Sequence, residues 1–236
     1  MSAVIWQDVE CGAYDADLKL WEELARDAEE PVLDLGCGAG RVALHLARRG
    51  HEMVGLDTDS SLLAAFSERA GGLAAEAELG DAGDFELKRE FGLVLAPMQL
   101  AQLFRGAGER VACLRCVAEH LRPGGIAAFA IVEEMPAPIA APPPLPDVRE
   151  VDGWVHSSLP LDAHLDGGEI VVRRLRQIVS PEGELKDRVD STVLRALSAD
   201  TLEAEAEEAG LKPARRREIP ATDDHVGSTV VLLEAP

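Results

Sequence analysis

Residues 31–41 read PVLDLGCGAGR. Its first five residues are a short apolar run, which predicts a buried strand. Three glycines then follow at alternate positions, Gly36, Gly38 and Gly40. A glycine-rich turn between a strand and a helix lets the backbone approach a ligand closely and points free N–H groups at it. The stretch therefore predicts a nucleotide-type site at a strand end, against the simpler interpretation of a tight turn without a ligand.

Strand and helix patterns alternate along the chain after this turn. Apolar runs that predict strands occur at 52–56, 73–79, 91–96 and 125–132. Amphipathic patterns that predict helices occur at 14–28, 41–49, 60–70 and 109–121. Ser60 is the expected N-cap of its helix. Such alternation predicts a parallel, doubly wound sheet that is covered on both faces.

The pattern changes after residue 132. Residues 133–147 hold six prolines, which predict an extended connector. Apolar runs at 154–161, 169–180 and 185–197, separated by glycine-containing turns, then predict a three-stranded antiparallel meander. A helix over 198–209, capped by Ser198, and two strands at 211–219 and 227–234 are expected to end the chain.

Composition excludes several classes of partner. The formal net charge of −20 argues against nucleic acid and against an anionic membrane surface. No apolar stretch approaches the roughly 20 residues of a membrane span, and no secretory signal pattern is present. Four cysteines in 236 residues do not suggest a disulfide framework. We therefore expect a reduced, cytoplasmic protein with neither membrane nor nucleic-acid partners.

The spacing of the glycines separates two kinds of cofactor site. A dinucleotide fingerprint is G-x-G-x-x-G/A, and its third position is occupied here by Arg41. The pattern present is G-x-G-x-G, with Asp34 two residues before the first glycine. This departure counts against a nicotinamide site, although an NAD(P)-dependent oxidoreductase on a similar sheet stays as an alternative.

The sequence resembles the class I, Rossmann-like S-adenosylmethionine (SAM)-dependent methyltransferases. VLDLGCGAGR matches their first motif, and VGLDTDS supplies the acidic residue, Asp57, at the end of the second strand. LGDAGDF follows the third strand, FGLVLAPMQL leaves the fourth, and LRPGGIAAFAIV resembles the family's turn into the fifth. The family's pattern often has an acid at the start of the fourth strand, where this chain has Gly92.

The resemblance implies a set of cofactor-binding residues. Asp57 would accept the ribose hydroxyls, Asp81 would meet the adenine amino group, and the N–H of Ala82 would meet the adenine ring. Arg41 would either reach the methionine carboxylate or lie exposed in the first helical turn. The full set implied for SAM is Asp34, Gly36, Cys37, Gly38, Gly40, Arg41, Asp57, Thr58, Asp81, Ala82, Pro97 and Tyr14.

The resemblance also implies the architecture. The expected α/β fold has a seven-stranded, mostly parallel Rossmann-like sheet with one antiparallel strand, plus an antiparallel β insertion. Residues 1–30 would be an N-terminal helical segment. The SAM-binding core would comprise 31–132 and 198–236, and 133–197 would be an inserted β-rich cap over the site.

Polar residues at the ligand edge of the sheet are candidates for catalysis. His225 is the first candidate for a general base, and Glu133 and Glu134 are the second. Solvent-exposed loop positions are the alternative for all three. Candidate substrate contacts are Met98, Gln99, Trp154, Thr222 and Asp224, with core packing as the alternative for Trp154.

Two other clusters have simpler interpretations. Cys113, Cys116 and His120 share one stripe of a helix, but zinc needs a fourth ligand, so no metal is expected. Arg174 and Arg176 alternate on one face of a strand. They would mark either an anionic substrate group or a solvated strand face.

These observations predict a SAM-dependent methyltransferase that acts on nitrogen or oxygen of a small molecule and releases S-adenosylhomocysteine (SAH). A non-catalytic SAM-binding protein is a second alternative, since intact motifs without turnover would look the same. The sequence gives neither the acceptor nor the oligomeric state.

Overall fold

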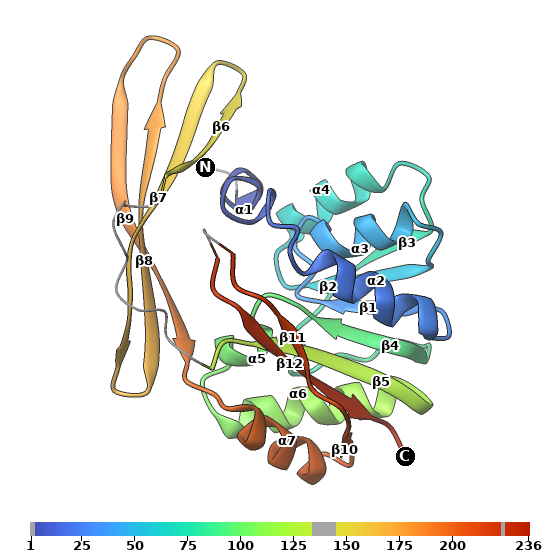
Figure 1. Ribbon diagram of the computed structural model, residues 1–236. Coiled ribbons are helices and arrows are strands. Elements are labelled where there is room, and N and C mark those ends of the chain that lie inside the picture. Colours follow the sequence, from blue (N-terminus) through green and yellow to red (C-terminus); the bar gives the residue numbers. More distant parts are fainter. Residues whose placement is uncertain (1–2, 134–144, 223–224) are drawn as a thin grey trace.

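The computed structural model describes residues 3–133, 145–222 and 225–236 (Figure 1). Within them, a central sheet has the strand order β10-β12-β5-β4-β1-β2-β3, and β11 also pairs with β12. The five parallel strands are β1 (Val32–Leu35), β2 (Met53–Asp57), β3 (Ala75–Leu79), β4 (Phe91–Ala96) and β5 (Leu121–Ile131). Their carboxyl ends meet at one edge of the sheet, which is where open α/β sheets bind ligands. The expected α/β class is confirmed.

The last strands close the other side of the sheet. β12 (Ser228–Glu234) runs antiparallel to β5, as expected for one strand. The single strand predicted over 211–219 is instead two short strands, β10 (Lys212–Pro213) and β11 (Arg217–Ile219), both paired with β12. The register with β12 shifts by one residue between them, since Pro213 is opposite Leu233 and Arg217 is opposite Val230, so a bulge separates the two strands.

Helices cover both faces of the central sheet. Their bounds are α1 (Ala3–Cys11), α2 (Leu18–Asp27), α3 (Arg41–Ala47), α4 (Ser60–Ala70), α5 (Leu100–Leu103), α6 (Ala107–His120) and α7 (Ala199–Glu208). Trp21, Leu44 and Phe66 of α2, α3 and α4 are buried in one core cluster. Leu114 and Leu202 of α6 and α7 are buried in the other. None of the helices among the described residues is long and apolar enough to cross a membrane.

The N-terminal region differs from its prediction. One leading helix was expected over 14–28, but two helices, α1 and α2, precede β1. The predicted N-cap of α4 is also wrong by one residue. Asp59, not Ser60, caps it, because its Oδ1 accepts hydrogen bonds from the N–H groups of Ser61 (2.8 Å) and Leu62 (3.3 Å). Ser198 does cap α7, since its hydroxyl accepts the N–H of Thr201 at 3.2 Å.

The insertion forms a separate antiparallel sheet of four described strands, one more than predicted. They are β6 (Asp147–Val151), β7 (Trp154–Asp166), β8 (Glu169–Val179) and β9 (Leu185–Arg195), in that order. β6 joins β7 through Asp152 and Gly153, whose φ values are 51° and 79°. An Asp-Gly pair with two positive φ angles is a strong hairpin signal. This hairpin follows directly after the proline-rich stretch, and it adds β6 to the three predicted strands.

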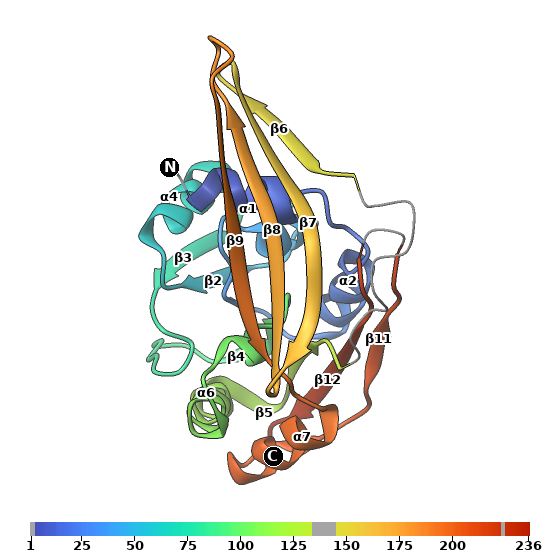
Figure 2. The same cartoon turned by 90° about the vertical axis from the view of Figure 1, so that its left-hand side faces the viewer.

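The inserted sheet stands over the ligand edge, and α1 lies between it and the core (Figures 1 and 2). One buried side chain, Gln102, joins the two ends of the insertion. Its Nε2 donates to the carbonyls of Val132 (3.1 Å) and Arg195 (3.0 Å), and its Oε1 accepts the N–H of Val132 at 2.8 Å. The insertion therefore leaves and re-enters the core at one point beside the ligand edge.

Candidate active site

The glycine-rich loop after β1 has the backbone that its sequence predicts. Gly36, Gly38 and Gly40 have φ values of 68°, 55° and 90°, a region that residues with side chains rarely adopt. Packing also requires glycine here. A Cβ at Gly40 would lie 2.7 Å from side-chain carbons of Leu44 and Phe66. The backbone of the loop can therefore adopt this conformation close to a ligand only with glycine at these three positions.

Asp34 lies buried beneath this loop. Its Oδ2 accepts the N–H of Ala43 at 3.1 Å, whereas its Oδ1 has no hydrogen-bond partner among the described residues. Burial raises the pKa of Asp34 to about 7. A buried acceptor without a donor is costly unless a ligand supplies the donor, so this oxygen marks a polar contact point.

Asp57 links the ends of the first two strands. Its Oδ2 accepts the N–H of Gly38 at 2.8 Å, and its Oδ1 accepts the N–H of Asp59 at 2.9 Å. The carboxylate that the motif places at the end of β2 therefore contacts the glycine loop directly. Thr58, the next residue of the predicted set, is exposed.

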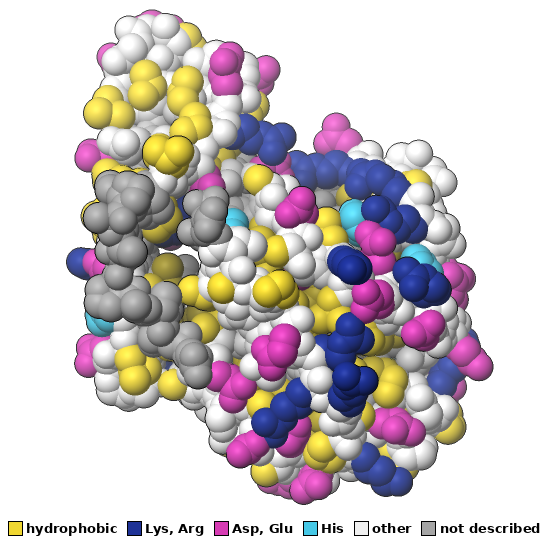
Figure 3. All heavy atoms as spheres, viewed as in Figure 1, with side chains coloured by type: hydrophobic (Ala, Val, Ile, Leu, Met, Phe, Trp, Pro, Cys, Tyr) yellow, Lys and Arg dark blue, Asp and Glu magenta, His cyan; other side chains and the backbone are white. Residues whose placement is uncertain are grey.

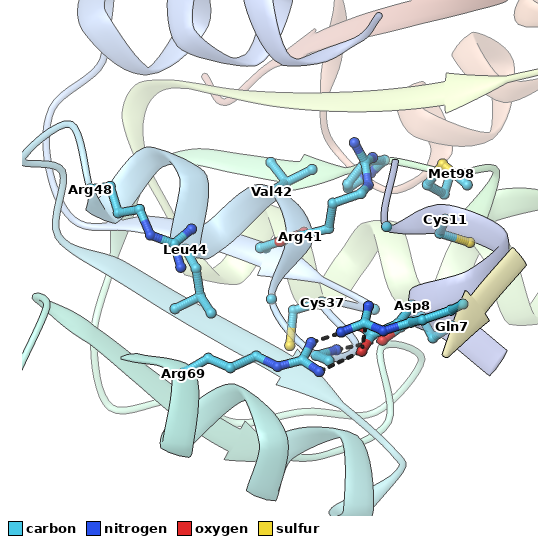
Figure 4. A pocket seen from close by; sticks show the side chains of 17 residues that line it. Gln7, Asp8, Cys11, Cys37, Arg41, Val42, Leu44, Arg48, Arg69 and Met98 are labelled. Carbon is cyan, nitrogen blue, oxygen red and sulfur yellow. Dashed lines mark hydrogen bonds and ion pairs between the residues drawn. The ribbon is translucent and has the colours of Figure 1, made fainter. Parts of the chain in front are cut away.

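A cavity of about 350 Å³ opens at this edge (Figure 4). The residues predicted for SAM or the acceptor that line it are Asp34, Gly36, Cys37, Gly40, Arg41, Pro97 and Met98. Three residues of α1 that the sequence did not suggest, Gln7, Asp8 and Cys11, form its opposite side. Trp6 and Val9 are three positions apart and are both buried, a spacing that indicates a helix, but no motif marks this helix as part of a site.

Asp81 and Ala82 follow β3 and lie outside the cavity lining. The Oδ1 of Asp81 accepts the N–H of Gly83 at 2.8 Å, which shapes the turn, and Ala82 is buried. Because β3 is next to β2 in the sheet, both residues share the ligand edge with Asp57.

Arg41 is held by the N-terminal region. Its Nη1 and Nη2 donate to the two carboxylate oxygens of Asp17 at 2.7 and 2.6 Å, and Nη1 also donates to the carbonyl of Tyr14 at 2.9 Å. Burial alone would lower the pKa of Arg41, but the bonds to Asp17 outweigh it and raise the pKa. The alternative of an exposed arginine is wrong, because the Arg41 side chain is 16% exposed.

Tyr14 lies between His225 and Arg41, which is one of the residues that line the cavity. The Tyr14 and His225 ring centroids are 4.6 Å apart, and the Arg41 guanidinium carbon is 5.2 Å from the Tyr14 centroid. Burial raises the pKa of Tyr14 to about 12, so its hydroxyl stays protonated at neutral pH. The Nδ1 of His225 lies 3.5 Å from Thr222 Oγ1. Three of the predicted residues are therefore neighbours, while Asp224 lies outside the described residues.

The other candidate bases and contacts lie apart from this group. Glu133 directs Oε1 at the N–H of Ala199, 2.7 Å away, at the start of α7. Glu134 lies outside the described residues. Trp154 stands at the β6–β7 turn, outside the cavity lining. It is 41% exposed, so the core-packing alternative is wrong.

The residues after β4 adopt unusual backbone conformations. Met98 and Gln99 have φ values of 59° and 62°, which are strained for residues with side chains. Met98 lines the cavity, and Nε2 of Gln99 donates to Ser228 Oγ at 3.4 Å. Strained residues of this kind cluster at ligand sites.

The two remaining clusters have structural roles. His120 accepts the N–H of Leu87 at 2.8 Å, and no group of three potential metal ligands exists in the described part of the chain. Arg174 and Arg176 point toward α1, with side-chain exposures of 21% and 15%, so the solvated-face alternative is wrong. Arg176 forms an ion pair with Glu10.

Comparison with known proteins agrees with this geometry. Residues 32–125 match the family model described as "Methyltransferase domain". This part of the chain is therefore similar to a methyltransferase domain. The resemblance drawn from the motifs is thereby confirmed for the part of the chain that holds the glycine loop and Asp57.

Two curated relatives align with part of the chain. A cypemycin N-terminal methyltransferase from a Streptomyces species is 33% identical over 113 residues, which are 48% of this chain and 46% of the relative. A dTDP-3-amino-3,4,6-trideoxy-alpha-D-glucopyranose N,N-dimethyltransferase from Streptomyces venezuelae is 30% identical over 95 residues, 40% of this chain and 39% of the relative. Each alignment spans less than half of the relative's length.

A solved structure shows the same fold over the whole chain. It is a SAM-bound amino pentose methyltransferase from Micromonospora echinaspora, with a TM-score of 0.72 at 18% identity. The alignment covers 100% of this chain and 98% of the other. The methyltransferase domain and the inserted sheet thus belong to one fold.

Proposed function

We propose that this protein transfers a methyl group from SAM to a small molecule. Nitrogen and oxygen are both chemically suitable acceptor atoms, and we propose nitrogen. The observation that carries the proposal is the glycine loop. It stands within the matched domain, above the unpaired Oδ1 of Asp34 and in contact with Asp57. The family match favours methyl transfer over hydride transfer by an NAD(P)-dependent enzyme.

The residues present fit SAM. The cofactor carries cationic and hydroxyl donors, and the loop offers two carboxylates to receive them. Asp34 has a free acceptor oxygen, and each Asp57 oxygen accepts one hydrogen bond within the described residues, which leaves further acceptor capacity. Asp34 and Asp57 would hold the cofactor, with Asp81 and Ala82 beside them at the same edge.

When bound, SAM supplies an activated methyl group, so the protein's task is binding, orientation and exclusion of water. The chain meets this task with a cavity lined by the loop, α1 and Met98. Aligning an acceptor with the methyl can supply roughly 7–11 kcal/mol in favourable intramolecular models. No covalent nucleophile is required.

A base is needed only to take the acceptor's proton, which is worth about 10²–10⁴-fold. His225 remains the first candidate, because it lies against Tyr14, which contacts the cavity-lining Arg41, and because it is exposed to solvent. Glu133 is the weaker candidate, since its carboxylate is already bonded to Ala199.

The choice of nitrogen rests on the relatives. One is named for N-terminal methylation and the other for N,N-dimethylation of an amino sugar nucleotide. A small acceptor also suits the inserted sheet, which stands over the ligand edge as a cap. The charge of −20 disfavours nucleic acid, and we place the enzyme in the cytoplasm.

A turnover assay tests the proposal. The purified protein is incubated with SAM and a panel of amines, amino sugars, phenols and carboxylic acids, and SAH release is measured together with product mass. We expect SAH to form with an amine and the product to gain one methylene unit. SAM binding without turnover on any acceptor would favour the non-catalytic alternative.

His225→Ala separates the role of the base from that of the cofactor site. It should slow turnover without weakening SAH binding, and the loss should shrink at high pH as the acceptor deprotonates unaided. Equal rates in both proteins across the pH range would remove His225 from the mechanism.

A further inference from the structure

Gln7 of α1 covers the middle of the glycine loop. Its Oε1 accepts the N–H of Ala39 at 2.7 Å, and its Nε2 lies 1.7 Å from where a Cβ of Gly38 would stand. Gly36 and Gly40 line the cavity together with Gln7 (Figure 4), whereas Gly38 does not, and the Gln7 amide occupies the space beside Gly38. The side chain thus fills the space above the central glycine of the cofactor motif.

One side of α1 is fixed to the methyltransferase core. Asp8, the next residue, accepts two hydrogen bonds from Arg69 of α4 at 2.9 and 2.7 Å. Arg149 of the inserted sheet also approaches Asp8, at 3.1 Å. These bonds hold Gln7 over the loop from its immediate neighbour.

The other side of α1 is fixed to the inserted sheet. Glu10 accepts hydrogen bonds from Arg176 at 2.6 and 2.7 Å and from Ser158 at 2.7 Å. Burial opposes the charge of Glu10, but these bonds outweigh it and lower its pKa, so the ion pair persists at neutral pH. Trp6 adds an edge-on contact with His156, 5.6 Å between ring centroids.

We propose that Gln7 is a gating residue for the cofactor site. A ligand that rests on Gly36–Gly40 must displace its amide from Ala39, and the ion pair between Glu10 and Arg176 sets how firmly α1 holds it there. The inserted sheet thereby controls access to the cofactor as well as covering the acceptor. The inference rests on the proposed function, since the ligand is SAM or SAH.

Gln7 and a bound ligand would compete for the same space and for the same hydrogen-bond donor. A ligand lying against the loop needs the volume above Gly38, where the Gln7 amide now lies. The N–H of Ala39 is a buried donor that Gln7 satisfies while the site is closed, so the closed state leaves no unpaired group there. In the closed state Gln7 accepts the N–H of Ala39, and in the open state the bound ligand would accept it. The ligand can therefore replace Gln7 without leaving this N–H unpaired.

Two substitutions at position 7 test the gate by calorimetric titration with SAH. Gln7→Ala removes the competitor, and SAH should bind about threefold to tenfold more tightly, as one neutral hydrogen bond predicts. Gln7→Glu strengthens the bond to Ala39 with a charge, and SAH should bind more weakly by a similar factor. A merely structural Gln7 would weaken binding in both variants.

Glu10→Gln tests the link to the inserted sheet. It removes the charge that holds Arg176, so SAH affinity should rise by less than in Gln7→Ala. The double variant Gln7→Ala/Glu10→Gln should bind SAH no more tightly than Gln7→Ala alone, because Glu10 acts only through Gln7. Gln177→Ala, on β8 and outside the cavity lining, is the matched control and should leave affinity unchanged.

Hydrogen exchange gives a reading without ligand. The amide of Ala39 should exchange faster in Gln7→Ala than in the wild type, and thermal melting checks that each variant is folded. If the wild type binds SAH and Gln7→Ala binds it equally or more weakly, the gating role of Gln7 is wrong and the proposed function stands. Absence of SAH and SAM binding in every variant would overturn the proposed function and the gate with it.

Discussion

The central sheet and the inserted sheet are stabilised in different ways. Every residue of β1 and β4 is buried, and the strands pack between two helical layers. In the inserted sheet, β9 is mostly exposed, including Leu185 at 58% and Val189 at 55%. Apolar burial therefore fixes the core, whereas the inserted sheet depends on its few attachments.

Those attachments are concentrated at two places, and they combine polar bonds with one small apolar cluster of Trp6, Val9 and Ile178. One is Gln102, which bonds both ends of the insertion. The other is α1, whose Glu10 pairs with Arg176. Regions with few buried apolar contacts open at lower free energy than a packed core. We expect the inserted sheet to shift while the methyltransferase core stays folded.

Deleting residues 148–196 and joining the ends with a short linker should have the largest effect on function. The core keeps the glycine loop and Asp57, so SAH binding should persist, whereas methyl transfer should fall below detection without a covered acceptor site. The two readouts are titration and SAH release. Full activity in the shortened protein would refute the role of the insertion as a cap.

An ion pair from each region gives a second comparison. Arg110 and Glu205 join α6 and α7 with side-chain exposures of 9% and 10% and an Nε–Oε2 distance of 2.7 Å. Arg110→Met leaves a buried carboxylate unpaired and should cost about 3–5 kcal/mol. Arg173→Met breaks the exposed pair with Asp162 and should cost under about 1 kcal/mol.

Urea denaturation measures both free energies of unfolding. The circular dichroism midpoints should separate the two variants clearly, with the wild type close to Arg173→Met. Equal losses in the two variants would show that the inserted sheet contributes to stability as the core does.

Asp34 gives the core a pH dependence of its own. The raised folded pKa, about 7 against 3.8 in a free chain, means that the folded state binds more protons than the unfolded state between these values. Stability from this group is therefore fully present below about pH 4 and is lost as the pH rises to about 7. Asp34→Asn, which stays neutral, should be more stable than the wild type at pH 8, by on the order of 4 kcal/mol.

The test compares unfolding free energies of both proteins from pH 4 to pH 8. The difference between them should grow with pH, since all other titrating groups are shared. A difference that is constant with pH would mean that Asp34 stays ionised when folded.

Local patterns predicted the core well because its signals are close in sequence. The alternation of apolar runs gave the five parallel strands, and the glycines with Asp34 and Asp57 gave the loop geometry. Positive φ angles at Gly36 and Gly40 follow from residue type alone.

The parts that were missed depend on distant partners. α1 carries no capping signal. The role of its charged residues depends on partners that are distant in the sequence, as Glu10 pairs with Arg176, 166 positions away. The burial of Arg174 and Arg176 was unpredictable for the same reason. Gln7 matches no motif, and only the fold brings it to Ala39.

The central claim is that the loop from Asp34 to Gly40, with Asp57, binds SAM and SAH. The most direct measurement is calorimetric titration with SAH of the wild type, Asp57→Ala and the control Asp59→Ala. Asp59 caps α4, so its loss should cost about 1 kcal/mol of stability while leaving the loop contacts of Asp57 in place. We expect saturable binding to the wild type, unchanged affinity in Asp59→Ala, and at least about tenfold weaker binding in Asp57→Ala, which loses charged hydrogen bonds. Absence of binding to the wild type, or equal affinity in all three proteins, would contradict the account.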